Sequence, residues 1–131
     1  GYVTWKENKF FGGGIKSFIT NCSKAKIPNC VNHPHNYYLE ILSELGLFGF
    51  FLILIIFSII FLKSFIKKYF SSGKYDEYYI ITPFIFLFLI EVFPIKNTGS
   101  FFSTINATYI FLILSILVSL LKSQYLIEKK T

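Results

Sequence analysis

The sequence predicts an all-α integral membrane protein, in which a polar loop precedes three transmembrane helices. Hydrophobic residues make up 53% of the 131-residue chain, whereas an average soluble domain has about 45–50%. Charged residues make up only 15%, against about 25% in such a domain. Most of the 17 Phe lie in long apolar runs instead of an alternating or helical stripe. Such runs are typical of segments whose solvent is lipid.

Residues 1–45 are mixed and polar, and we expect them to form a periplasmic loop. They hold the only Trp, both Cys, both His and the glycine run at 12–14. Such a run permits a sharp turn or a close backbone approach. It is not a phosphate-binding loop, because no Gly-Lys-Ser/Thr follows it. The chain begins with Gly and shows no signal-peptide pattern, so we expect it to be the C-terminal fragment of a longer protein.

The end of this loop, from about 35 to 45, has the pattern of an amphipathic helix on the membrane surface. Pro34 suits a first helical turn, where its missing N–H costs nothing. At 3.6 residues per turn, one face carries Tyr38, Ile41, Leu42 and Leu45, and the other carries Asn36, Glu40, Ser43 and Glu44. We expect this helix to end at Gly46, where the chain turns into the first span.

Three apolar runs follow, at 46–66, 78–93 and 105–121. About 20 apolar residues suffice to cross a bilayer, and backbone groups in lipid must pair within their own segment. The runs therefore predict transmembrane helices, although the second is short and is broken by Pro83. A turn at 67–77, a loop at 94–104 and a tail at 122–131 connect and follow them.

Lysine placement predicts the orientation of these spans. The chain has a net charge of +6, with 13 basic residues that are all Lys. Many of them flank the apolar spans, so they indicate membrane anchoring and not a nucleic-acid partner. They gather around the 67–77 turn and in the tail, whereas the 94–104 loop has only Lys96. We therefore expect the turn and the tail in the cytoplasm, and residues 1–45 and 94–104 in the periplasm. Residues 1–45 carry five Lys of their own, which weaken the charge argument, so their placement also depends on the cysteines.

The two cysteines suggest a staple in the periplasmic loop. Cys22 and Cys30 enclose seven residues, and in an oxidising compartment such a pair forms a disulfide. The alternative is two free thiols on the cytoplasmic side. A zinc site that joins both cysteines with His33 and His35 has suitable ligand types, but its spacing matches no common zinc pattern. We expect no metal.

Two ionisable residues are candidates for chemistry. His35 has the side chain most often used as a general base near neutral pH, and at the lipid–water boundary it could deprotonate a substrate hydroxyl. The alternative is a loop histidine that caps a helix or makes a hydrogen bond. We expect Pro34 to hold His33 in a different direction. Glu91 lies within the second span, where an ionisable residue is a functional candidate; alternatively, it faces water near the outer surface or pairs with Lys96.

The segment His-Pro-His-Asn-Tyr-Tyr-Leu-Glu-Ile-Leu-Ser-Glu-Leu-Gly-Leu-Phe-Gly-Phe, residues 33–50, resembles the signature of the O-antigen ligase and O-antigen polymerase family of bacterial membrane proteins. In that family a periplasmic loop ends in His-Asn and leads through Glu and Gly-x-x-Gly into a transmembrane helix. The elements that correspond are His35, Asn36, Glu40, Glu44, Gly46 and Gly49. Trp5 with residues 11–18 and Pro94 with residues 98–102 resemble further family elements, so the resemblance covers about residues 3–120.

The resemblance implies transfer of a glycan from an undecaprenyl diphosphate carrier to an acceptor hydroxyl, on lipid A–core or on another glycan. It implies a multi-pass protein of the bacterial inner membrane, with its active face in the periplasm and with no cofactor. His35 takes the catalytic base role, and we expect substrate binding by Lys16, Asn36, Glu40 and Glu91. Family members hold the diphosphate with arginines, of which this chain has none.

We expect these arginines in upstream helices, so that the fragment is inactive alone. Lys16 could replace them, although lysine holds phosphate only as a point charge, or this copy is inactive. The alternative function is a non-catalytic membrane subunit or a transporter fragment. A transporter places polar groups near the bilayer midplane, whereas the middle of each expected span is nearly pure Ile, Leu and Phe.

Overall fold

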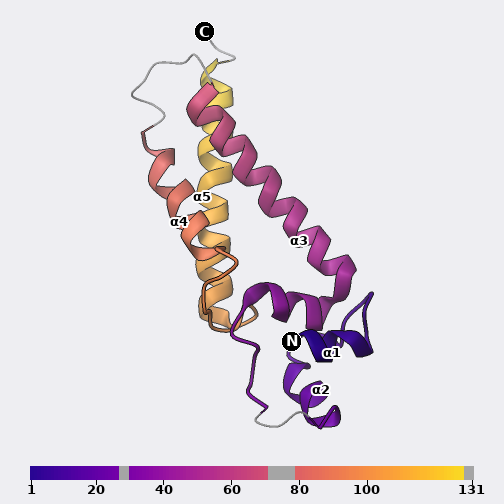
Figure 1. The fold of residues 1–131 in the computed structure, drawn as a ribbon. Coiled ribbons are helices and arrows are strands. Elements are labelled where there is room, and N and C mark those ends of the chain that lie inside the picture. Colours follow the sequence, from indigo (N-terminus) through magenta and orange to yellow (C-terminus); the bar gives the residue numbers. More distant parts are fainter. Residues whose placement is uncertain (27–29, 71–78, 129–131) are drawn as a thin grey trace. The chain divides into compact units, whose positions relative to one another are not determined.

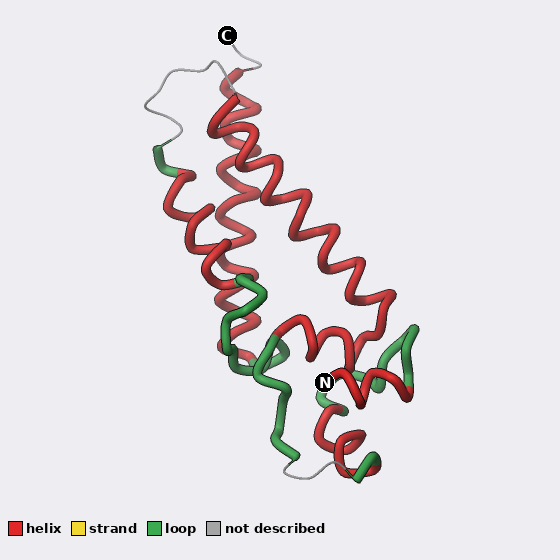
Figure 2. Tube along the Cα trace, in the orientation of Figure 1, coloured by secondary structure: helices red, strands yellow, loops and turns green. Residues whose placement is uncertain are grey.

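The described residues fold into helices and loops without a strand, which confirms the all-α class (Figure 2). The computed structural model describes residues 1–26, 30–70 and 79–128, with side chains in the last helix up to residue 123. The helices are α1 (Tyr2–Glu7), α2 (Phe18–Lys24), α3 (Tyr37–Phe70), α4 (Ile81–Glu91) and α5 (Thr104–Glu128) (Figure 1). They form two compact units, each of which is described by itself. The loop unit comprises Gly1–Ile55 and Phe93–Ala107, and the helix unit comprises Ile56–Val92 and Thr108–Thr131.

The loop unit gathers α1, α2 and the 93–107 segment around the first turns of α3. Its core is apolar, with Phe18 and Cys22 from α2, Tyr37 and Ile41 from α3, and Phe101 all buried. The rings of Tyr37 and Phe101 meet edge to face, with centroids 5.5 Å apart. The composition of residues 1–45 predicts a loop that becomes helical near its end, whereas the structure has two further short helices there, α1 and α2.

Helix α3 bends at Gly46, whose backbone is non-helical (φ 68°, ψ −169°) (Figure 1). The kink lies where we expect the turn from the amphipathic helix into the first span, although the helix begins at Tyr37 instead of residue 35. A helix on a membrane surface would turn its polar face to water. Instead, Glu40, Ser43 and Glu44 are each at most 2% exposed, because this face packs against the loops of the unit.

The helix unit supports two of the three expected spans. Helix α3 and the stretch Thr104–Ser123 of α5 are long and apolar enough to cross a membrane. Helix α4 has 11 residues, which is roughly 16 Å at 1.5 Å per residue, against a hydrocarbon core of about 30 Å. A span at 78–93 is therefore not shown, and residue 78 lies outside the described residues.

The ends of the spans also differ from expectation. Helix α3 continues through Phe70, and α5 continues to Glu128 into the expected polar tail. Residues 71–77 of the expected turn and 129–131 of the tail lie outside the described residues. Within the unit, Phe57 of α3 and Phe88 of α4 meet edge to face, with ring centroids 5.3 Å apart.

Candidate functional site

Two glycines allow the loop after α1 to pack closely against the bend of α3. Both have positive φ, 71° at Gly12 and 68° at Gly46. A Cβ at Gly12 would overlap the carbonyl of Glu44, and a Cβ at Gly46 would overlap that of Phe10. The glycine run thus makes the close backbone approach that such a run permits. Four hydrogen bonds complete the contact: Gly13 N to Ser43 O (3.0 Å), Gly14 N to Glu44 O (2.9 Å), Leu47 N to Lys9 O (2.9 Å) and Phe48 N to Phe10 O (3.1 Å).

The Glu44 carboxylate binds the segment that starts α2. Its Oε2 accepts from the N–H of Lys16 at 2.6 Å, and its Oε1 accepts from the N–H of Phe18 at 3.4 Å. The first N–H groups of a helix have no partner within the helix, so this carboxylate satisfies the first of α2. Burial raises the pKa of Glu44, and the two N–H groups act against that rise. Glu44 precedes the expected first span and has a structural role here.

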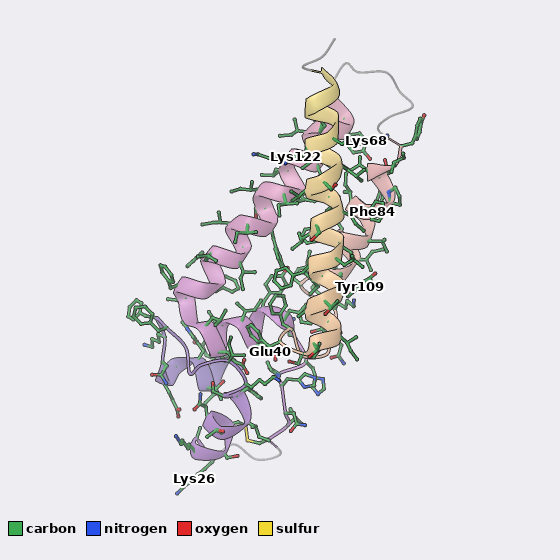
Figure 3. The ribbon with its side chains drawn as sticks, turned by 180° about the vertical axis from the view of Figure 1, so that it is seen from behind. Lys26, Glu40, Lys68, Phe84, Tyr109 and Lys122 are labelled. Atoms are coloured by element: carbon green, nitrogen blue, oxygen red, sulfur yellow. A yellow bond between two sulfur atoms is a disulfide. The ribbon has the colours of Figure 1, made fainter. Side chains whose placement is uncertain are left out.

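The Glu40 carboxylate, one turn earlier, binds the 93–107 segment in the same way (Figure 3). It accepts from the Ser100 hydroxyl and from the Phe101 N–H, each at 2.5 Å. Glu40 is 2% exposed, so both of its oxygens are occupied inside the protein. Hydrogen bonds to a charged group contribute more than neutral ones, about 1.5–3 kcal/mol each. The two carboxylates together tie two distant loops to one helix.

Asn36 caps α3 and also holds the 93–107 segment. Its Oδ1 accepts from the N–H groups of Tyr38 (3.0 Å) and Leu39 (3.1 Å), as helix N-cap residues do. Its Nδ2 donates to the carbonyl of Pro94 at 2.8 Å. The cap of α3 is therefore Asn36, which removes one structural alternative for His35.

His35 lies directly before this cap, with its backbone fixed and its side chain exposed. Its φ is 52°, a left-handed conformation that costs a non-glycine residue roughly 1–2 kcal/mol. Its carbonyl accepts from the N–H of Thr98 at 2.9 Å. The ring of His33 lies edge-on to that of His35, with centroids 4.4 Å apart. The expectation that His33 points in a different direction is therefore wrong.

The geometry can support proton transfer at His35. An imidazole can take a proton from a hydroxyl within hydrogen-bond reach, and this ring faces outward from a backbone that two neighbours hold. Backbone strain at an exposed titratable residue is a feature of functional sites. His35, Asn36 and Glu40 are thus brought together with the 94–101 loop.

The other expected binding residues, Lys16 and Glu91, lie on other elements. The Lys16 side chain is exposed, and its backbone N–H donates to the Glu44 carboxylate. Glu44 lies eight residues beyond Asn36, which is about 12 Å along the helix. Glu91 is the last residue of α4 and belongs to the helix unit. The roles of Glu44 and Thr98 were not predicted from the sequence. The available signal was the pair of carboxylates four residues apart, with no lysine on the same helical stretch to pair with them.

A disulfide joins Cys22 of α2 to Cys30, with Cα atoms 6.0 Å apart (Figure 3). Because the two sulfur atoms bind each other, the zinc alternative loses its thiolate ligands. Among residues 1–26, 30–70 and 79–128, no group of three His, Cys, Asp or Glu is placed to hold a metal ion.

Comparisons with known proteins bear on the same region. No curated protein and no solved structure matches the chain. A family model matches the segment that contains Gly12 and Gly46, the two buried carboxylates, the disulfide and His35. Residues 1–54 match the family described as O-antigen ligase, which confirms the resemblance of this chain to the O-antigen ligase family.

Proposed function

We propose that this chain is part of a membrane enzyme that transfers a glycan from undecaprenyl diphosphate to an acceptor hydroxyl. The acceptor is lipid A–core in a ligase or another glycan in a polymerase, and the active face is periplasmic. The family match supports a ligase-like or polymerase-like enzyme. The observation that carries the proposal is the exposed ring of His35 on a backbone that Asn36 and Thr98 hold in place.

In the proposed reaction His35 is the general base. The acceptor hydroxyl gives its proton to a nitrogen of the imidazole, and its oxygen forms a bond to the anomeric carbon of the donor sugar. The bond between that carbon and the diphosphate oxygen breaks, and the diphosphate leaves with the electron pair. A positioned base typically raises the reaction rate by about 10²- to 10⁴-fold.

The polar residues near His35 hold other parts of the protein in place. The side chains of Asn36 and Glu40 are hydrogen-bonded to other groups of the protein, so we assign them to holding the 94–101 loop beside His35 instead of to direct substrate contact. Lys16 is an exposed cation that can attract a phosphate as a point charge. The proposal gives Lys16 and Glu91 no contact with the reacting atoms.

The test is His35→Ala in membranes that contain the full-length protein at matched expression. We expect glycan transfer from a carrier-linked donor to fall by about 10²- to 10⁴-fold, with the protein still inserted and folded. The matched control is His33→Phe, which keeps a ring in edge contact with His35 and removes a titratable group. Retained transfer in His35→Ala, or equal loss in both variants, would remove the base role.

A further inference from the structure

The loop between α1 and α2 carries two exposed aromatic side chains beside the bend of α3. Phe10 is 68% exposed and Phe11 is 80% exposed. The Phe11 ring lies against the ring of Phe48, with centroids 6.4 Å apart, and Phe48 is itself 68% exposed. The contact between the two rings therefore leaves most of each uncovered. Together the three rings form an exposed aromatic surface that belongs entirely to the loop unit.

This aromatic surface continues an exposed apolar stripe on α3. The stripe consists of residues at i, i+3, i+4 and i+7, which share one helix face: Phe48, Phe51, Leu52 and Ile55, all exposed. Because α3 is long and apolar enough to cross a membrane, the stripe faces either lipid or another helix. Contacts between helices in membranes favour small residues, which let the backbones approach, whereas every residue of this stripe is bulky. The stripe therefore suits lipid, and Phe11 extends it onto the loop.

The backbone of the loop also suits an apolar surrounding. Three consecutive carbonyls accept from N–H groups of the protein: Asn8 O from Gly12 (2.9 Å), Lys9 O from Leu47 (2.9 Å) and Phe10 O from Phe48 (3.1 Å). Backbone polar groups that face hydrocarbon must find their partners inside the protein. The last two bonds serve α3 as well, because N–H groups directly after a break in a helix lack partners within the helix. The loop thus closes the start of the apolar part of α3 and lies at its level.

We propose that Phe10 and Phe11 insert into the edge of the bilayer beside α3, so that lipid covers the exposed aromatic surface. Aromatic side chains on the apolar face of membrane-surface segments bury in this way. The helix before the loop fits the same position, since Trp and Tyr are enriched at membrane interfaces. The rings of Tyr2 and Trp5 in α1 lie 5.6 Å apart, and Tyr2 is exposed. The proposal requires α3 to cross the membrane, and it does not depend on glycan transfer.

The test measures the depth of position 11 in the full-length protein in phosphatidylcholine vesicles. Phe11, Phe48 or Val31 is replaced by p-acetylphenylalanine, whose ketone takes a nitroxide label without involving any cysteine. Phe11 and Phe48 keep a phenyl ring in this way. Electron spin resonance then compares collisions of the label with oxygen, which concentrates in lipid, and with a neutral nickel chelate, which stays in water.

Val31 is the matched control, because it is also an exposed apolar residue of the loop unit. It belongs to the 30–36 segment, which Figure 1 shows away from the bend of α3. We expect a higher ratio of oxygen to nickel collisions at position 11 than at position 31. The depth at position 11 should differ from that at position 48 by no more than the 6.4 Å between their rings.

Three results would overturn the proposal, and each has its own meaning. Frequent nickel collisions at position 11 would place the loop in water. Low collision rates with both reagents would show that another segment of the protein, or a second copy, covers the aromatic surface. Equal ratios at positions 11 and 31 would show that apolar exposure alone determines the result, with no specific insertion beside α3.

Discussion

The interactions within the loop unit differ in kind from those within the helix unit. In the loop unit, the side chains of Asn36, Glu40 and Glu44 bind partners that lie 26 to 61 residues away in the chain. In the helix unit, the hydroxyls of Ser64 and Ser115 bind carbonyls only four residues back in their own helices. Directional contacts between distant segments therefore shape the unit that carries His35, while apolar contacts such as Phe57 on Phe88 shape the other.

This difference teaches where the molecule should tolerate change. A buried carboxylate accepts only donors at specific places, and losing one leaves a buried polar group unsatisfied at a cost of about 1–3 kcal/mol. An apolar contact depends on volume, and volume-conserving swaps usually cost less than about 1.5 kcal/mol. We therefore expect the loop unit to be the more sensitive of the two to small polar and backbone changes.

The largest effect should come from Gly46→Ala. The backbone of Gly46 (φ 68°, ψ −169°) lies in a region that only glycine enters readily, and the strain costs other residues about 1–3 kcal/mol. The added Cβ would also overlap the Phe10 carbonyl, and a backbone atom cannot rotate away. We expect loss of the folded loop unit, measured as rapid proteolysis of residues 1–45 in membranes.

Gly14→Ala is the matched control for this change. Gly14 also has a positive φ, 98°, but a Cβ there would meet nothing within 4 Å. It should therefore carry only the backbone strain and leave the loop largely protected. Equal protease sensitivity of the two variants would show that the contact between the two glycines contributes nothing.

A smaller effect should distinguish buried polar groups of the two units. Glu40→Gln keeps one acceptor oxygen but turns an NH₂ group toward a donor, the Ser100 hydroxyl or the Phe101 N–H. We expect a loss of about 1–3 kcal/mol in thermal unfolding of the detergent-solubilised protein, and a lower transfer rate because the loop beside His35 loosens.

Ser64→Ala provides the comparison from the helix unit. Ser64 is 0% exposed, and its hydroxyl donates to the Ile60 carbonyl at 2.8 Å. That carbonyl keeps its place in the helix without the hydroxyl, so we expect a change within about 1 kcal/mol. If Ser64→Ala costs as much as Glu40→Gln, the contrast drawn between the units is wrong.

A feature of the fold or of the site could be predicted from the sequence where neighbouring residues determine it. It could not be predicted where residues distant in the chain determine it. Composition predicts the helical membrane class, and the local pattern around Gly46 predicts the bend. The local pattern also predicts which residues share a face of the helix before Gly46. The burial of Glu40 and Glu44, however, depends on loops far away in the chain. Helical periodicity assigns a residue to a face and cannot identify what covers that face. The same reason explains why the contact between the His33 and His35 rings was missed.

The second expected span, which is not shown, illustrates a different limit of composition. The apolar run at 78–93 satisfies a test of composition, but the helix within it covers only Ile81–Glu91. Pro83 lies in its first turn, where proline is tolerated, and Pro94 follows shortly after its end. Hydropathy reports which solvent a segment prefers and not where its helix starts and stops. The length of α4 could therefore not be read from its apolar content.

The smallest effect is expected at Thr98, where two hydroxyls in one loop should behave differently. Thr98 is 7% exposed, and its Oγ1 has no hydrogen-bond partner among the described residues. Thr98→Val has nearly the same shape and keeps the N–H that donates to His35. We expect the free energy of unfolding to stay equal or rise by about 1 kcal/mol, because an unsatisfied buried hydroxyl is removed.

Ser100→Ala, two residues along, is the matched control, because its hydroxyl donates to Glu40. Its loss should lower the free energy of unfolding by about 1.5–3 kcal/mol, the range for hydrogen bonds to charged groups. Thermal unfolding of both variants gives the comparison, and glycan transfer should stay within about twofold for Thr98→Val, because the base at His35 is unchanged. A fall in transfer without a fall in stability would mean that the Thr98 hydroxyl contacts the substrate. The role of Thr98 would then go beyond holding the His35 backbone, and its side chain would belong to the reacting site.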